Sequence, residues 1–220
     1  LKVFNTGIRI YRQTDGAFDM TVAPLVNAWG FGFSNKDSVS AQLIDSLMLL
    51  VGMDKLRLQD GVIVKERPEI MLDASAIAKG YAVDVVAEFF ESKGVENYLV
   101  EIGGEMRSRG VNRRSEPWRV GIDKPIDGLP TESRDLQMVI SFSGLAIATS
   151  GNYRNFYIQD GKKFAHIIDP KTGFPVDHSL LSVSIIAQDC MTADAYATAC
   201  MVMGLNRARE FVEGIKGVEA

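Results

Sequence analysis

Residues 72–84, LDASAIAKGYAVD, decide how the middle of this chain folds. Lys79 and Gly80 stand where a turn is expected to pass into a helix, and the residues just before them are mostly small. Small side chains let another molecule approach the backbone closely, and a helix start offers unpaired N–H groups and a partial positive charge to an anion. The stretch therefore favours a site for a phosphorylated ligand.

The same stretch has a second interpretation, in which it only begins an ordinary amphipathic helix. Asp73 or Ser75 would then cap the helix at its start, and Gly94 would end it. The apolar face of this helix would consist of Val83, Val86, Phe89 and Phe90. Both interpretations place a long helix after Lys79.

The composition is typical of a globular protein. The chain has 220 residues, of which 46% are hydrophobic and 24% charged, and it can bury the core of one domain or of two closely packed lobes. The net charge is −4 and the Lys and Arg residues are scattered, which argues against a nucleic-acid-binding surface. No segment approaches the ~20 consecutive apolar residues that span a bilayer.

Two cysteines, Cys190 and Cys200, form neither a CxxC motif nor a disulfide framework. Cys200 falls in an apolar helical pattern, so we expect it to be buried. The chain begins at Leu1 without the charged and apolar regions of a signal peptide. We therefore expect it to be part of a longer polypeptide.

Helical periodicity and strand alternation divide the chain into short elements. Helices are expected at 4–13, after Pro24, at 40–51, from Lys79 to Gly94, at 192–203 and at 206–215. Strands are expected in a hairpin at 56–65 and at 98–109, 118–122, 136–143, 145–150, 153–159 and 181–187. Of these, 145–150 and 153–159 are expected to pair through a turn at 150–152. The irregular alternation predicts an α+β fold, a single compact, two-lobed domain with mainly antiparallel sheets flanked by helices.

Residues 192–204, TADAYATACMVMG, carry a pair of oxygen-bearing side chains. If Thr192 caps the helix, Asp194 lies in the first turn, and Thr198 lies four residues later on the same face. Asp194 would then complement the helix dipole, and Thr198 would bond a backbone carbonyl. The alternative is a site for a hard cation, because Mg²⁺ takes a few oxygen ligands from protein and completes its shell with water and phosphate.

Residues 164–175, FAHIIDPKTGFP, hold His166 beside a predicted turn. This histidine is either structural or catalytic. His178 lies twelve positions away with no Cys or Glu at ligand spacing, so a zinc site is not expected. Gly103 and Gly104, which follow a strand, either form a bulge or let the backbone approach a ligand. The chain has neither a GxGxxG fingerprint nor a P-loop motif, so a nucleotide would bind to neither a Rossmann fold nor a P-loop.

Taken together and in order, seven segments resemble the ApbE-like flavin transferase family, the FAD:protein FMN transferases. They are GAFDMTVAPLVNAWGFG at 16–32, LDASAIAKGYAVD at 72–84, LVEIGGEMRSRG at 99–110, WRVGIDKP at 118–125, IATSGNYRNFY at 147–157, HIIDPKTGFPV at 166–176 and TADAYATACMVMG at 192–204. Each segment is modest by itself, but together they extend over almost the whole chain.

The resemblance implies a T-fold-like flavin transferase domain over residues 1–220 that lacks the family's N-terminal segment. The implied enzyme uses Mg²⁺ to cleave FAD, attaches FMN through a phosphoester to a Thr or Ser of an acceptor flavoprotein and releases AMP. The acceptor would carry a D-G-x-S/T-G-A-T-like segment. Two alternatives stay open: an FAD pyrophosphatase that gives FMN and AMP, and a non-catalytic flavin-binding protein.

Members of the family are often periplasmic lipoproteins. The resemblance therefore implies a periplasmic or other extracytoplasmic location. The membrane would be reached only through a lipid anchor on a segment absent from this chain.

The resemblance also assigns roles to residues. The metal ligands would be Asp194, Thr198 and the backbone carbonyl of Ala76, and the catalytic base would be His166. The residues in contact with FAD would be Ala17, Phe18, Asp19, Lys79, Gly103, Gly104, His166 and Ile167. A carbonyl that binds a metal cannot also be an ordinary helix acceptor. The long helix is therefore expected to begin near Ala78 and not at the Asp73 cap.

Overall fold

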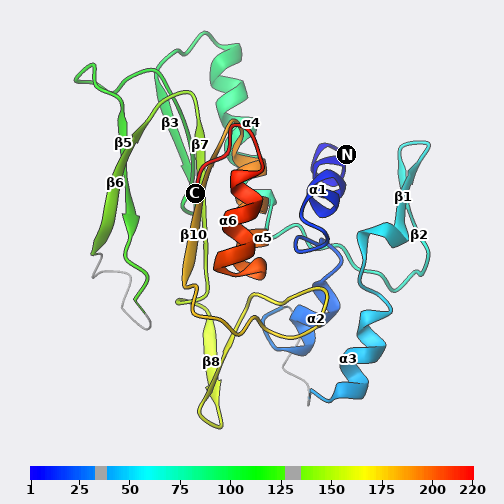
Figure 1. Cartoon of the computed structure of the whole chain (residues 1–220). Helices are drawn as coiled ribbons and strands as arrows, with labels where there is room; N and C mark the ends of the chain where they lie inside the picture. Colours follow the sequence, from blue (N-terminus) through cyan, green and yellow to red (C-terminus); the bar gives the residue numbers. More distant parts are fainter. Residues whose placement is uncertain (33–38, 127–134) are drawn as a thin grey trace.

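The computed structural model describes residues 1–32, 39–126 and 135–220, and it is an α+β fold in three layers (Figure 1). The central layer is a four-stranded antiparallel sheet in the order β10-β7-β4-β3. Its strands are β3 (Tyr98–Ile102), β4 (Glu105–Arg109), β7 (Ala146–Gly151) and β10 (Ser182–Ala187). Helices lie on one face of this sheet and a two-stranded hairpin lies on the other, which confirms the predicted fold class.

The sheet contributes side chains to both outer layers, because successive residues of a strand point to opposite faces. The helical layer is α4 (Ala78–Ser92) beside α5 (Cys190–Met203), and the hairpin is β5 (Trp118–Asp123) with β6 (Leu136–Phe142). The side chains that face the helices are those of Tyr98, Val100, Ala146, Ala148 and Ile185. Those that face the hairpin are the side chains of Leu99, Met106, Ile147 and Ile186.

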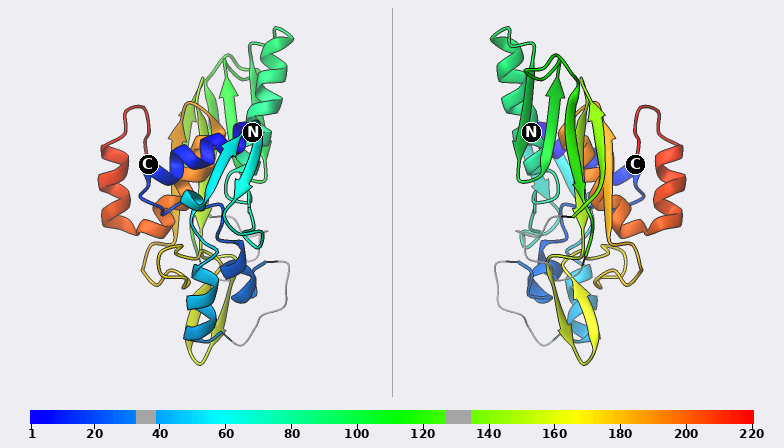
Figure 2. Two further views of the ribbon diagram at one scale, coloured as in Figure 1. Left: turned by 90° about the vertical axis from the view of Figure 1, so that its right-hand side faces the viewer. Right: turned by 90° about the vertical axis from the view of Figure 1, so that its left-hand side faces the viewer.

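Helix α5 forms the centre of the core. Eleven of its fourteen residues are buried, because the sheet covers one side while α1 (Lys2–Gln13) and α6 (Leu205–Glu213) cover others. Figure 2 shows α6, in red, on the side of α5 away from the sheet. A helix that is apolar on most sides needs such enclosure. Cys190 and Cys200 are buried free thiols on this helix, as expected for Cys200.

A second group of elements lies at the bottom of Figure 1. It comprises α2 (Ala23–Ala28), α3 (Ala41–Met48) and a hairpin of β8 (Phe156–Gln159) and β9 (Lys162–Ala165). Trp29, which follows α2, stacks on Phe164 of β9 with ring centroids 5.5 Å apart. This contact joins segments that are far apart in the sequence, and buried Leu25 and Ile44 extend the same cluster.

The predicted helices are all present, and α4 begins at Ala78, as expected. The hairpin at 56–65 is also confirmed, as β1 (Leu56–Gln59) and β2 (Val62–Lys65), and follows a 3-10 turn at Met53–Lys55. Its turn residues Asp60 and Gly61 both have positive φ. Within the described ranges, no helix combines the length and the apolar character that crossing a bilayer requires.

The expected pairing of 145–150 with 153–159 is wrong. Strand β7 pairs with β4 and β10, and its buried Ala146 and Ala148 have neighbours on both sides. Strand β8 pairs with β9, a strand that the sequence pattern does not predict. The turn between them is Asp160-Gly161, with positive φ at both residues, and Asp-Gly is a dipeptide that favours such two-residue hairpins.

Two details of the predicted helices are also wrong. Helix α5 begins two residues before Thr192, and Asp189 caps it by accepting a hydrogen bond from the Thr192 amide (2.8 Å). On α4, Phe89 is 56% exposed and does not belong to the buried face, whereas Asp84 does. Helical spacing locates a buried face, but it does not distinguish a surface acid from a buried one that has partners.

Candidate active site

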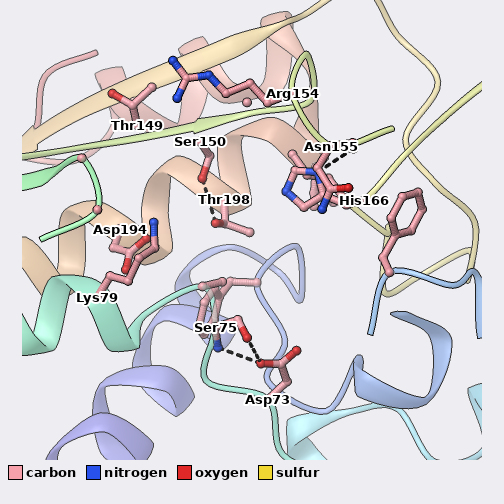
Figure 3. Close-up of a pocket in the computed structure, with 18 of the residues that line it drawn as sticks. Asp73, Ser75, Lys79, Thr149, Ser150, Arg154, Asn155, His166, Asp194 and Thr198 are labelled. Carbon is pink, nitrogen blue, oxygen red and sulfur yellow. Dashed lines mark hydrogen bonds between the residues drawn. The ribbon is translucent and has the colours of Figure 1, made fainter. Parts of the chain in front are cut away.

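A cavity of about 870 Å³ opens between the central sheet, α5 and the segments that carry the lower group of elements. Every residue that was given a role from the sequence lines it. These residues are Ala17, Phe18, Asp19, Ala76, Lys79, Gly103, Gly104, His166, Ile167, Asp194 and Thr198. Figure 3 shows that side chains from the start of α4, from α5 and from the segment around His166 face this common space.

Asp194 is a buried carboxylate on α5, only 4% exposed. Its Oδ2 accepts a hydrogen bond from the backbone amide of Gly80 at 3.0 Å. Burial raises the pKa of Asp194 to about 6; the negative charge of Glu105 adds to this shift, while the Gly80 amide and Lys79 oppose it. The first turn of α5 contains no acidic residue, so the interpretation of Asp194 as a first-turn partner of the helix dipole is wrong.

The carbonyl of Ala76 lies in a turn that precedes α4. In a regular helix the amide of Gly80 would donate to this carbonyl, four residues earlier. Here the Gly80 amide donates to Asp194 instead, while the neighbouring amides of Ala78 and Tyr81 donate to Ala74 (2.8 Å) and Ile77 (3.1 Å). The Ala76 carbonyl thus lacks its helical donor, as expected if it serves another purpose.

Gly80 is required where α4 crosses the start of α5. A Cβ atom at this position would lie 2.3 Å from the carbonyl oxygen of Cys190 and 2.8 Å from the Cα of Met191. Both are backbone atoms, so the clash could be relieved only by moving a helix. Glycine therefore permits the close approach that brings its own amide to Asp194.

Thr198 lies one helical turn after Asp194, on the wall next to β7. Its Oγ1 is 3.0 Å from Oγ of Ser150, and Figure 3 shows the two hydroxyls pointing toward each other. The hydrogen-bond partner of Thr198 is therefore Ser150 and not a backbone carbonyl. This bond also leaves the Thr198 oxygen with lone-pair capacity for a cation, since a hydroxyl has two acceptor positions.

A carboxylate, a hydroxyl and a free backbone carbonyl make up the donor set of Asp194, Thr198 and Ala76. These are hard oxygen ligands, and their small number suits Mg²⁺, which keeps waters and binds substrate phosphates. Elsewhere in the described ranges, no cluster of three or more His, Cys, Asp or Glu side chains is placed to hold a metal. The residues present therefore fit Mg²⁺ better than a transition metal that prefers nitrogen or sulfur.

Lys79 lies in the first turn of α4, with its side chain half exposed at the cavity. Its Nζ is 2.6 Å from Oε1 of Glu105, a carboxylate that is 2% exposed. Gly103 and Gly104 form the tight turn between β3 and β4, with φ of 64° and 103°, so the bulge interpretation is wrong. A Cβ on Gly103 would lie 3.3 Å from Cδ of Lys79, so the turn leaves room for the lysine.

His166 lies at the other end of the cavity, after β9. Its Nδ1 is 3.1 Å from the backbone carbonyl of Asn155, and since a carbonyl only accepts, Nδ1 carries the proton and donates it. Nε2 of the neutral ring is then the basic nitrogen. Burial lowers the pKa of His166, an effect to which Lys79 adds and which the bond to Asn155 opposes. Phe31 packs edge-on against the ring, with centroids 6.3 Å apart.

The segment at 17–19 forms another side of the cavity, and hydrogen bonds to nearby residues hold it in place. Oδ1 of the buried Asp19 accepts from the amide of Thr21 at 2.7 Å and from its hydroxyl at 2.5 Å. Burial raises the pKa of Asp19, and its bonds to Thr21 oppose the shift. The amide of Phe18 is held by Oγ1 of Thr14 (3.1 Å).

Several residues of the site were missed in the sequence. Gly80 positions Asp194, and Ser150, Asn155 and Arg154 line the cavity beside the predicted residues. All four lie within the seven segments, the last three in the segment at 147–157. Arg154 donates to Asp123 of β5 at 2.7 Å, at the edge of the cavity. His178 is not part of the site, since its Nε2 bonds the Met201 carbonyl (2.7 Å).

Comparison with known proteins agrees with this geometry. The model of the ApbE family matches residues 1–220. The chain belongs to the ApbE family. The FAD:protein FMN transferase of Vibrio cholerae is 44% identical to it over 215 residues, which cover 97% of this chain and 63% of that protein. The protein of the same name from Escherichia coli is 41% identical over 216 residues, covering 96% and 60%.

Solved structures of the ApbE family have the same fold. The flavin transferase ApbE from Vibrio cholerae aligns with a TM-score of 0.87 and 42% identity, covering 99% of this chain and 68% of that one. The ApbE protein of Thermotoga maritima aligns with a TM-score of 0.84 and 32% identity, covering 96% and 68%. The chain spans about three fifths of the length of the curated relatives it matches.

Proposed function

We propose that this ApbE-family chain forms the active site of a Mg²⁺-dependent FAD:protein FMN transferase. The names of its relatives support the reaction. The observation that carries the proposal is that the candidate metal ligands, nucleotide contacts and base line one cavity, although they come from distant segments. A volume of about 870 Å³ is within the range of cofactor sites, roughly 300–1,000 Å³.

Asp194, Thr198 and the Ala76 carbonyl would hold Mg²⁺ at the wall formed by α5 and the start of α4. When bound, the ion would neutralise charge on the pyrophosphate of FAD. Lys79, held by Glu105 at the same wall, would place a second positive charge beside the phosphates. Since phosphoryl transfer depends mainly on positioning and on charge stabilisation, these groups would supply most of the catalysis.

The acceptor would be a Thr or Ser hydroxyl that reaches the cavity from outside. Its proton would pass to Nε2 of His166, and its oxygen would form a bond to the FMN phosphorus. The bond from that phosphorus to the bridging oxygen would break, and AMP would leave with the electron pair. The proton-bearing Nδ1, bonded to Asn155, keeps Nε2 in the basic form that this step requires.

A D-G-x-S/T-G-A-T-like acceptor segment and an extracytoplasmic location, membrane-anchored by a segment outside this chain, are part of this proposal. Both are supported by the resemblance to the family alone.

The test is one incubation of the chain with FAD, Mg²⁺ and an acceptor protein that carries such a segment. Flavin fluorescence that stays on the denatured acceptor, with AMP released in equal amount, is the expected result. An acceptor with Val in place of the target Thr is the matched control and should stay unlabelled. Equal amounts of free FMN and AMP without labelling would instead identify an FAD pyrophosphatase. Unchanged FAD would contradict the proposal and leave a flavin-binding protein.

A further inference from the structure

Asp84 is a buried acid on α4 that the proposed function does not use. We infer that Asp84 is a positioning residue, which holds the start of α5 against α4 so that Asp194 and Thr198 face the metal. The inference rests on the proposed function, because it concerns the same metal site.

The Asp84 carboxylate, 1% exposed, accepts hydrogen bonds from the first two amides of α5. The Cys190 amide donates to Oδ1 at 3.0 Å, and the Met191 amide donates to Oδ2 at 2.9 Å. These amides have no partner inside their own helix, because the first four N–H groups of a helix lack acceptors. A side chain of α4 thus caps α5 from outside, in addition to the local cap by Asp189.

Arg107 of β4 compensates the buried charge of Asp84. Its Nη1 donates to Oδ1 of Asp84 at 3.0 Å, and its Nη2 is 3.3 Å from Glu91 at the far end of α4. A buried carboxylate is costly unless it is paired and hydrogen-bonded. With a guanidinium and two amides, the Asp84 carboxylate meets both conditions.

Two contacts, one helical turn apart, therefore join α4 to α5. Asp84 holds the amides at the start of α5, and Gly80, four residues earlier on α4, donates to Asp194, four residues after Cys190. Packing against the sheet, α1 and α6 encloses α5, and this pair of polar contacts adds a fixed register between α5 and α4. The loss of the Asp84 contact would therefore shift Asp194 relative to the other ligands.

The experiment replaces Asp84 by Asn in the whole chain and titrates the metal-free protein with Mn²⁺ by calorimetry. Asn has the same shape as Asp but only one acceptor oxygen. Its NH₂ group, a donor, would therefore face another donor, either a backbone N–H of α5 or Arg107. We expect Mn²⁺ affinity to fall by roughly 10- to 100-fold, the usual effect of losing an outer-shell partner. Flavin transfer should fall at limiting Mg²⁺ and recover at excess Mg²⁺, which a general loss of structure would not permit.

Glu88→Gln is the matched control. Glu88 is an exposed acid one turn further along α4, and within the described residues its ion pair is with Lys2 (2.8 Å). Its Mn²⁺ affinity should equal that of the unmodified chain. Unchanged affinity in Asp84→Asn, with a folded circular dichroism spectrum, would overturn the inference.

If Asp84→Asn does not fold, Asp84→Glu takes its place, because it keeps a carboxylate for Arg107 but displaces it by one methylene from the amides of Cys190 and Met191. Weaker Mn²⁺ binding is again expected, and unchanged binding would again overturn the inference. An unmodified chain that binds Mn²⁺ but neither cleaves FAD nor labels an acceptor would contradict the proposed function, and the Mn²⁺ titrations would still decide the role of Asp84.

Discussion

The carboxylate of Asp194 is held charged in a place where charge is costly. It is buried, its pKa is raised to about 6, and the Gly80 amide donates to one of its oxygens. At pH 7 the side chain is still mostly ionised, since the pH lies above that pKa. A cation bound there would offset the cost, so the same burial that weakens the metal-free fold would strengthen metal binding.

Asp194→Asn should therefore abolish Mg²⁺-dependent activity and yet stabilise the metal-free chain at pH 7. The folded protein binds a proton at Asp194 more tightly than the unfolded chain does, so this group lowers stability as the pH rises from about 4 to about 6, and the full cost stays constant at higher pH. The Asn variant lacks that cost. A melting temperature higher by about 2 °C or more in the presence of a chelator is expected, since 1 kcal/mol corresponds to about 2–4 °C in a chain of this size. A lower melting temperature would contradict the assignment.

His166 should determine how the rate falls in acid. Burial lowers its pKa below the ordinary 6.5, so Nε2 stays basic at neutral pH and is protonated only at lower pH. At saturating Mg²⁺, which keeps Asp194 ionised, the acid limb of kcat should have its midpoint below pH 6.5. His166→Ala should reduce kcat by about 10²–10⁴ and remove this limb. An unchanged rate would exclude His166 as the base.

At the scale of elements, the close packing of α4 on α5 creates the wall that we propose binds the metal. Gly80 allows the approach, its amide reaches Asp194, and the Ala76 carbonyl is left without its helical donor as a consequence. The contact between α4 and α5 thus explains why α4 begins only at Ala78.

Gly80→Ala tests this packing, because two effects oppose each other. Alanine favours a helix over glycine by about 1 kcal/mol, but its Cβ would lie 2.3 Å from the Cys190 carbonyl oxygen, and overpacking typically costs about 1–3 kcal/mol. We expect no net stabilisation in urea unfolding and weaker Mn²⁺ binding. Glu88→Ala, an exposed change on the same helix, controls for helix propensity. A variant that is more stable and binds Mn²⁺ normally would contradict the packing argument.

Local sequence patterns were sufficient to predict most helices and strands, because periodicity and turn residues act within a few positions. They failed where distant partners decide the outcome. The residues of β7 do not specify its partners, and only β4 and β10 determine its place in the sheet. Thr192 is a good cap by type, but Asp189 was already in place three residues earlier.

The site was predictable in a different way. Asp194 and Thr198 share a helix face by spacing alone, whereas nothing local relates them to His166 or Ala76. Only the order of the seven segments, through the family resemblance, connected these residues before the structure placed them on one cavity. Asp84 was missed because an acidic residue is rarely buried without a partner, and its partner Arg107 comes from a strand that follows later.

On the scale of the whole molecule, the cavity lies where the sheet with its helices meets the segments of the second group. One wall carries Asp194, Thr198, Ala76 and Lys79, and the opposite end carries His166 beside Phe31. A ligand with a pyrophosphate in its middle would contact both. We propose that the first wall binds a divalent cation against that pyrophosphate.

The most direct test is a crystal structure of the chain with FAD and Mn²⁺, with anomalous data collected at the manganese edge. We expect one anomalous peak within bonding distance of the Asp194 carboxylate, Thr198 Oγ1 and the Ala76 carbonyl oxygen, beside the pyrophosphate of FAD. A peak at another place, or FAD bound in the cavity with no peak at these three oxygens, would contradict it.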